Sequence, residues 1–477
     1  MLAPLAPTSW SIDHAAHLLG RAGFGGTPEQ IRALHQLGLQ GAVDSLLSSG
    51  VPQIPAPAWT QDPTPARKEL TMSMQAGMTD EQKRELFKET LQLEHRHILE
   101  LRSWWLERMR QNRRPLLEKM TLFWHGHFAT SVEKVKSAWL MWQQNETLRA
   151  YALGSFREML RAMTRDPAMI RWLDLGKSRR GEPNENFARE AMELFTLGEG
   201  HYTEDDVREG ARAFTGHRID PETQEFVFVR QAHDYGLKKF LGRTGNFNAD
   251  DAVDIILAQP QCARFIAKRV WEFLAYENPE PSVLEAAATA FREGSYEVKP
   301  LLHAIFTSQA FYSPQAMRTQ IKSPVDWLVN SCIALDCGLP AQPALDFMLT
   351  RLGQLPFAPP NVRGWEGGKS WISSSTLVLR YNLAGMLVGS RDPDARRFEK
   401  TQSGSAANMQ KVAPESLRNQ PEPLAEALVF RLFGTPLLPR MLEKARGAIA
   451  ESPMPISDAD ARTISQKLMS TPDFQLT

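Results

Sequence analysis

The sequence predicts a mainly α-helical protein, with one large irregular helical domain and one small β-hairpin. Helix signals dominate, because apolar residues recur at helical spacing between recognisable helix starts and ends. Strand-like segments are confined to a short region at residues 225–241. The composition is ordinary for a globular protein, with 42% hydrophobic and 23% charged residues. We therefore expect a packed core and not a chain that is disordered throughout.

The first helices have clear boundaries. Residues 11–19 show a helical pattern, which the glycine-rich loop 23–26 ends. Residues 27–30 (Thr-Pro-Glu-Gln) predict a helix start, with threonine as the N-cap, proline at the first position and glutamine at the third. We expect this helix to end at Gly38. Residues 51–66 are rich in proline and predict an exposed, extended loop.

The middle of the chain combines a long helix with the strand-like segments. The helix is predicted over residues 80–110, along which leucine, isoleucine and tryptophan recur. Another helix begins at Pro115 and runs into a segment that contains two histidines. Residues 225–229 and 239–241 have the composition of strands and flank His233. We expect these two strands to form one hairpin with a long turn.

Composition shifts divide the chain into three parts. The main helical domain is expected to cover residues 1–390, including a proline- and glycine-rich loop at 356–368. Residues 391–422 are polar and lack periodicity, which predicts a linker. Residues 423–477 are then a small C-terminal helical appendage. No repeat with a fixed period is visible.

Charge and cysteine content argue against several classes of protein. The 55 basic and 55 acidic residues balance, which argues against general binding to nucleic acid or to an anionic membrane. The three cysteines, Cys262, Cys332 and Cys337, are too few for a disulfide framework, and we expect them to be small buried apolar residues. No segment approaches the roughly 18 apolar residues that span a bilayer. The first residues do not resemble a signal peptide, so the expected location is the cytoplasm.

Three polar signatures indicate a site. They are Phe-Trp-His-Gly-His-Phe at 123–128, Asn-Glu-Asn-Phe-Ala-Arg-Glu at 184–190 and His-Asp-Tyr-Gly at 233–236. Amide, carboxylate, guanidinium and imidazole groups are costly to bury without partners, so their concentration between apolar helices favours a shared polar site. No nucleophile elbow, phosphate loop, dinucleotide fingerprint or zinc helix is present. The signatures therefore locate a site without naming a reaction.

The first signature places two histidines on different faces of a helix. His127 falls on the apolar face with Phe123, and His125 lies about 160° away around the helix. Two histidines so arranged on an unbroken helix cannot bind the same ion. His127 is a candidate metal ligand or general base. The alternative is a core histidine that is hydrogen-bonded to a carboxylate.

The second signature opens a helix that is predicted to follow Pro183 and Asn184 and to run to Leu197. Asn186, Glu190 and Glu193 form a stripe along the edge of its apolar face. Arg189 lies four residues from a glutamate on either side, which permits ion pairs within the helix. The stripe suits the lining of a site, and it equally suits a surface that solvates the helix and links it to a neighbour.

The ordered set of motifs resembles a bacterial family, domain of unknown function 1800 (DUF-1800). The matching residues are 17–25, 123–128, 184–190, 193–198, 214–216, His233 and Asp234 with Lys238, 241–242 and 359–365. The resemblance implies a largely helical fold and no established activity. It implies a sulfatase-like companion protein as a partner and, because many members carry export signals, export as an alternative to the cytoplasm. Phe195 stands where the family often has histidine, which weakens the idea of a metal site common to all members.

The first functional hypothesis is a metal-assisted hydrolase of unknown substrate. In this hypothesis His127, Glu190 and His233 act as acid/base groups or as ligands of a divalent metal. Activation of water by a bound metal requires at least three protein ligands around an open position.

In this hypothesis the substrate is bound by Asn186, Arg189, Arg363 and Trp365. Trp371 lies on the same loop as Trp365, over the cleft. Two alternatives remain open. One is a binding or assembly protein, because tryptophan and arginine are enriched where binding energy concentrates. The other is a buried polar network that only fixes how the helices pack.

Overall fold

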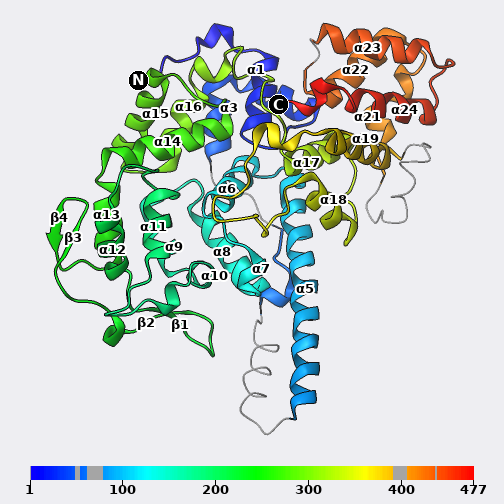
Figure 1. The fold of residues 1–477 in the computed structure, drawn as a ribbon. Coiled ribbons are helices and arrows are strands. Elements are labelled where there is room, and N and C mark those ends of the chain that lie inside the picture. Colours follow the sequence, from blue (N-terminus) through cyan, green and yellow to red (C-terminus); the bar gives the residue numbers. More distant parts are fainter. Residues whose placement is uncertain (1, 49–53, 62–78, 390–405, 436–437) are drawn as a thin grey trace.

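The computed structural model describes residues 2–48, 54–61, 79–389, 406–435 and 438–477. Helices make up most of it, and the strands form two small two-stranded sheets (Figure 1). The predicted mainly α fold is therefore confirmed. The long helix α5 (Asp80–Gln111) projects from the body of the molecule, while α22 to α24 lie together beside α19 and α21.

The described residues form the following α-helices, given in chain order. In the first half they are α1 (Ile12–Arg21), α2 (Pro28–Gln36), α3 (Gly38–Leu47), α5, α6 (Pro115–His127), α7 (Val132–Val135), α8 (Ala138–Tyr151), α9 (Phe156–Arg165), α10 (Pro167–Trp172), α11 (Glu185–Glu193) and α12 (Glu204–Ala213). In the second half they are α13 (Ala249–Leu257), α14 (Pro260–Leu274), α15 (Pro281–Glu293), α16 (Val298–Phe306), α17 (Pro324–Leu335), α18 (Ala344–Leu352), α19 (Ser374–Val388), α21 (Met409–Val412), α22 (Pro421–Phe433), α23 (Pro439–Ala450) and α24 (Asp458–Met469).

Helix starts follow the capping signals of the sequence. Thr27 and Gln30 form the predicted capping box at the start of α2, and Thr79 forms another with Gln82 at the start of α5. The end of α2 differs from the prediction, because the helix stops at Gln36 and Gly38 begins α3. A proline-rich loop was predicted at 51–66, of which only residues 54–61 are described.

The strands pair differently from the predicted hairpin over residues 225–241. β2 (Phe226–Phe228) pairs with β1 (His217–Ile219), and β3 (Lys238–Phe240) pairs with β4 (Arg243–Gly245). Two hairpins thus replace one.

The turn between β3 and β4 explains the missed pairing. Leu241 and Gly242 connect these strands with φ values of 45° and 80°. Positive φ at both positions is what a two-residue hairpin turn requires. Because leucine rarely adopts such a conformation, Leu241 does not read as a turn residue in the sequence.

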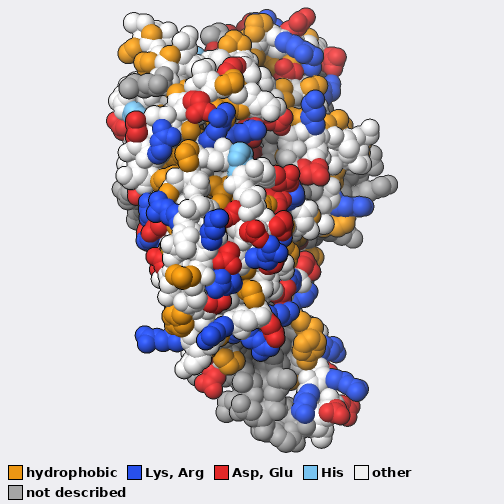
Figure 2. All heavy atoms as spheres, turned by 60° about the vertical axis from the view of Figure 1, so that its left-hand side comes forward, with side chains coloured by type: hydrophobic (Ala, Val, Ile, Leu, Met, Phe, Trp, Pro, Cys, Tyr) orange, Lys and Arg blue, Asp and Glu red, His pale blue; other side chains and the backbone are white. Residues whose placement is uncertain are grey.

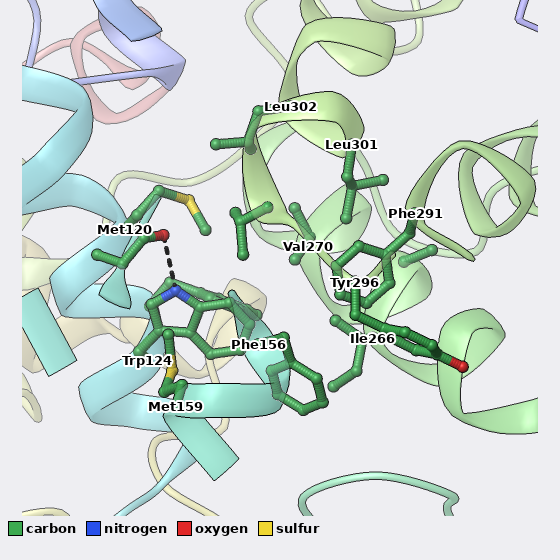
Figure 3. Packing of buried hydrophobic residues seen from close by; sticks show 14 of the residues in the cluster. Met120, Trp124, Phe156, Met159, Ile266, Val270, Phe291, Tyr296, Leu301 and Leu302 are labelled. Atoms are coloured by element: carbon green, nitrogen blue, oxygen red, sulfur yellow. Dashed lines mark hydrogen bonds between the residues drawn. The ribbon is translucent and has the colours of Figure 1, made fainter. Parts of the chain in front are cut away.

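Most of the helices around the site share one hydrophobic core. Trp124 of α6 packs near Met120, Phe156 and Met159, and on its far side the cluster continues to Ile266 of α14 (Figure 3). Its indole Nε1–H donates a hydrogen bond of 3.1 Å to the carbonyl oxygen of Ala152, so the only polar atom of this ring is satisfied.

A second core joins α5 and α17 to α19 with α22 to α24. Helices of the predicted main domain and of the predicted appendage therefore contribute to one cluster. The predicted linker, 391–422, falls partly outside the described residues. In the part that is described, Met409 and Val412 are buried in this second core. The division at 390 and 422 stays a prediction.

A buried ionic network connects α5, α6 and α8. The Glu118 carboxylate accepts hydrogen bonds from Trp105 and Arg108, each at 2.9 Å, and from Arg149 at 3.1 Å. Burial alone would raise the pKa of Glu118, but the two guanidinium groups outweigh it and lower the pKa.

The molecular surface carries both signs of charge. On the face drawn in Figure 2, basic and acidic side chains are interspersed over most of the area. Within the described residues, no helix combines the length and the apolar character that crossing a membrane demands.

Substitution of Glu118 tests the network. Glu118→Gln removes the buried carboxylate that Arg108 and Arg149 share, so we expect the free energy of unfolding to fall by about 3–5 kcal/mol. Glu133→Gln is the matched control, because Glu133 pairs with Lys136 at 3.6 Å on the exposed surface and should cost less than about 1 kcal/mol. Urea unfolding measures both. Equal losses in the two variants would contradict the role given to Glu118.

Candidate functional site

Helix α6 ends in two histidines with different partners. The backbone N–H of Phe357 donates a hydrogen bond of 3.0 Å to Nε2 of His125. Nε2 of His127 lies 3.0 Å from the carbonyl oxygen of Phe195. Because a carbonyl oxygen can only accept, Nε2 of His127 carries the proton and its Nδ1 is left as an acceptor.

Both rings are buried and uncharged near neutral pH. Burial is the main cause that lowers the pKa of each to about 3, with Arg149 acting on His125 and Arg269 on His127. Nδ1 of either ring has no hydrogen-bond partner among the described residues. A buried polar atom without a partner costs roughly 1–3 kcal/mol. His127 also lines a cavity, although its Nδ1 atom is inaccessible to solvent.

The segment 355–371 packs over the end of α6. Gly364 has a φ of +80°, and a Cβ atom at this position would overlap the carbonyl oxygen of Gly126. The ring of Trp365 lies 6.0 Å from that of His125, centroid to centroid. The first polar signature and the Arg-Gly-Trp motif, far apart in sequence, are thus brought together.

Arg363 connects the same segment to the region that follows α11. Its guanidinium group lies 3.0 Å from a carboxylate oxygen of Glu193 and 3.1 Å from one of Glu199. The hydroxyl of Tyr202 donates a hydrogen bond of 2.7 Å to Glu193. Burial, and next the charge of Glu193, raise the pKa of Glu190, which belongs to the same acidic group.

A cavity of about 340 Å³ lies between the end of α6, α14, the start of α17 and residues 365–371, and we call it the Trp365 cavity. Its polar and aromatic lining consists of Phe123, His127, Arg269, Glu272, Phe273, Glu277, Asn278, Gln320, Ser323, Asp326, Gln354, Trp365, Glu366 and Trp371. Three residues singled out in the sequence, His127, Trp365 and Trp371, therefore face one space.

Some of these polar groups are occupied by the protein itself. Asp326 accepts a hydrogen bond of 2.5 Å from Lys119, and Gln354 accepts one of 3.0 Å from the backbone of Val325. Gln320 donates a hydrogen bond of 3.0 Å to the carbonyl oxygen of Glu272. These hydrogen bonds fix the positions of Asp326, Gln354 and Gln320 in the lining of the Trp365 cavity.

Other groups of the cavity remain available. The side chains of Arg269, Glu277 and Glu366 make no hydrogen bond or ion pair with any other residue that the structure describes. These three exposed side chains give the cavity both hydrogen-bond donors and acceptors without a protein partner among the described residues.

The second signature contributes less to this cavity than the sequence suggested. Arg189 pairs with Glu204 at 2.7 Å and with Glu185 at 3.4 Å on the surface of α11. Asn186 is exposed beside them. Neither residue, nor Glu190, lines the cavity. Their roles in binding or catalysis stay predictions.

His233 belongs to a different part of the molecule, the connection between β2 and β3. Its Nδ1 lies 2.9 Å from the carbonyl oxygen of Thr215, and burial lowers its pKa. The adjacent Asp234 binds the guanidinium group of Arg212 at 2.8 Å. This signature therefore builds its own contacts with the end of α12.

The predicted metal ligands do not meet. Across the part of the chain that the structure describes, no three histidine, cysteine, aspartate or glutamate side chains are close enough to hold a metal ion together. His127, Glu190 and His233 lie on three separate elements, and His127 and His233 each contact a backbone carbonyl oxygen there. This geometry does not support the metal set that the sequence suggested.

Sequence reasoning missed several residues of the cavity. Arg269 and Glu272 lie on α14 outside its buried apolar face, where charged residues are usual and carry no functional signal. Glu277 and Asn278 follow that helix in a short connection. Only their convergence with α6 and with residues 365–371 distinguishes them, and sequence spacing cannot reveal it.

Two glycines of the segment 355–371 test how it docks. Gly364 and Gly367 have φ values of +80° and +78°, but a Cβ atom at Gly367 would meet nothing within 4 Å. Alanine strains the backbone at both positions because φ is positive at each, and only Gly364→Ala also collides with Gly126.

We expect Gly364→Ala to increase backbone hydrogen exchange in residues 355–365, measured by mass spectrometry, much more than Gly367→Ala does. Equal exchange in the two variants would show that the close approach to α6 does not hold this segment.

Comparison with known proteins identifies the family. The model of the family described as "Protein of unknown function (DUF1800)" matches residues 17–476. No curated protein and no solved structure matches the chain. Because the family match covers almost the whole chain, the protein belongs to the DUF1800 family, whose description assigns no activity.

Proposed function

We propose that this protein binds a small, polyhydroxylated ligand such as a sugar in the Trp365 cavity. The observation that carries the proposal is the set of three charged side chains, Arg269, Glu277 and Glu366, that line one space beside Trp365 and Trp371 without a protein partner among the described residues. These three side chains are exposed and hydrated, so a ligand with complementary hydroxyl groups would replace the water molecules bound to them.

The mixture of groups determines the class of ligand. The carboxylates of Glu277 and Glu366 accept hydrogen bonds, and Arg269 only donates them. A hydroxyl group both donates and accepts, so a ligand that carries several hydroxyls satisfies all three side chains.

The shape and the walls of the cavity agree with such a ligand. Trp365 and Trp371 supply aromatic surface on one side, which suits the apolar face of a sugar ring. A volume of about 340 Å³ is at the small end of the range for ligand sites.

Hydrolysis is the second candidate function. The sequence suggested a metal-assisted hydrolase, but of its three metal ligands only His127 lines this cavity. The carboxylates of Glu272, Glu277 and Glu366 favour a different chemistry, because paired carboxylates are the acid and base of glycoside hydrolysis. Release of a reducing sugar from a disaccharide would distinguish hydrolysis from binding alone. The cytoplasmic location and the sulfatase-like partner stay predictions.

Titration with neutral sugars tests the proposal. Glucose, N-acetylglucosamine and their β-1,4-linked disaccharides are added to the full-length protein and followed by calorimetry. We expect saturable binding of at least one probe. We expect Arg269→Gln to raise Kd by about tenfold and Trp365→Ala to abolish binding.

Arg264→Gln is the matched control, because Arg264 lies on the same helix but pairs with Glu285 at 2.6 Å outside the cavity. This variant should bind as the parent protein does. If no probe binds, or if Arg264→Gln weakens binding as much as Arg269→Gln, the proposal is wrong.

A further inference from the structure

A second cavity of about 320 Å³ lies where α6 begins, α8 ends and α16 begins. We call it the Arg114 cavity. Its charged lining consists of Arg114, Arg149, Lys299 and Glu146. Three cations and one carboxylate thus face a space that shares no lining residue with the Trp365 cavity.

The protein neutralises only part of this charge. Arg149 is 3% exposed and is engaged by Glu118 at 3.1 Å, by Asn145 at 2.6 Å and by Glu146. Arg114 and Lys299 are half-buried, and their side chains form no hydrogen bond or ion pair with the other described residues. Two positive charges therefore point at the cavity without a counter-charge.

The backbone holds these two cations on fixed elements. Arg114 is the N-cap of α6, and Lys299 is the second residue of α16. The N–H of Val298 donates a hydrogen bond of 2.9 Å to the carbonyl oxygen of Gly154, which fixes the start of α16 beside the end of α8. Neither helix has a side-chain cap. The positive ends of both helix dipoles therefore add to the charge of the side chains.

We propose that the Arg114 cavity binds the phosphate group of a small molecule. A tetrahedral oxyanion presents acceptors in several directions at once, which a guanidinium group and an ammonium group can meet together. The cavity is larger than one phosphate ion, so it leaves room for the rest of a small phosphorylated molecule. The balanced charge of the chain argues against a nucleic acid as the source. This site is independent of the proposed sugar site.

Calorimetric titration with inorganic phosphate and with pyrophosphate at low ionic strength tests the proposal. We expect saturable binding to the full-length protein. Each of Arg114→Gln and Lys299→Gln should weaken it by about tenfold, and the double variant should abolish it. Phosphate should also raise the melting temperature of the parent protein but not of the double variant.

Arg440→Gln with Lys444→Gln is the matched control. Both residues are exposed on α23, and their replacement removes the same two charges elsewhere on the molecule. The control should bind phosphate as the parent protein does, and chloride at the same ionic strength should not compete. Absence of saturable binding, equal loss in the two double variants, or full competition by chloride would each overturn the proposal.

Discussion

The end of α6 and the segment 355–371 approach each other so closely that one side of the contact must be glycine. Gly364 lies against the carbonyl oxygen of Gly126, and the backbone of Phe357 is hydrogen-bonded to His125, 232 residues earlier in the chain. This contact places Trp365 beside His125 and brings the rest of the segment over His127. Without this contact between α6 and the segment 355–371, residues 365–371 would not line the Trp365 cavity.

The sequence located the parts of this arrangement better than their roles. Helical periodicity and capping signals predicted α2 and α5 well, because these signals act within a few neighbouring residues. The helical periodicity correctly placed His125 and His127 on different faces of α6. In the structure, His125 contacts Phe357 and His127 contacts Phe195. Of the three polar signatures, however, only the first contributes residues to the Trp365 cavity. His233 contacts the backbone of Thr215, whereas His127 lines the Trp365 cavity.

What the sequence missed depends on contacts between distant segments. The hairpin prediction failed because Leu241 adopts a positive φ that its side chain gives no reason to expect. Arg269 and Arg114 each look like ordinary surface residues of a helix. They differ from other surface arginines because each lines a cavity and no described residue pairs with it. Only the three-dimensional structure shows this absence of a partner.

A continuous set of contacts runs between the two cavities. Arg149 lines the Arg114 cavity and binds Glu118, which in turn accepts a hydrogen bond from Trp105. The Trp105 ring lies 5.1 Å from that of His125, which holds the segment over the Trp365 cavity. Transmission of a signal would require some member of this set to have two alternative arrangements. Glu118 is instead buried and bound on several sides, so moving it would expose uncompensated charge. The network therefore favours two cavities held at fixed positions over two that change shape together.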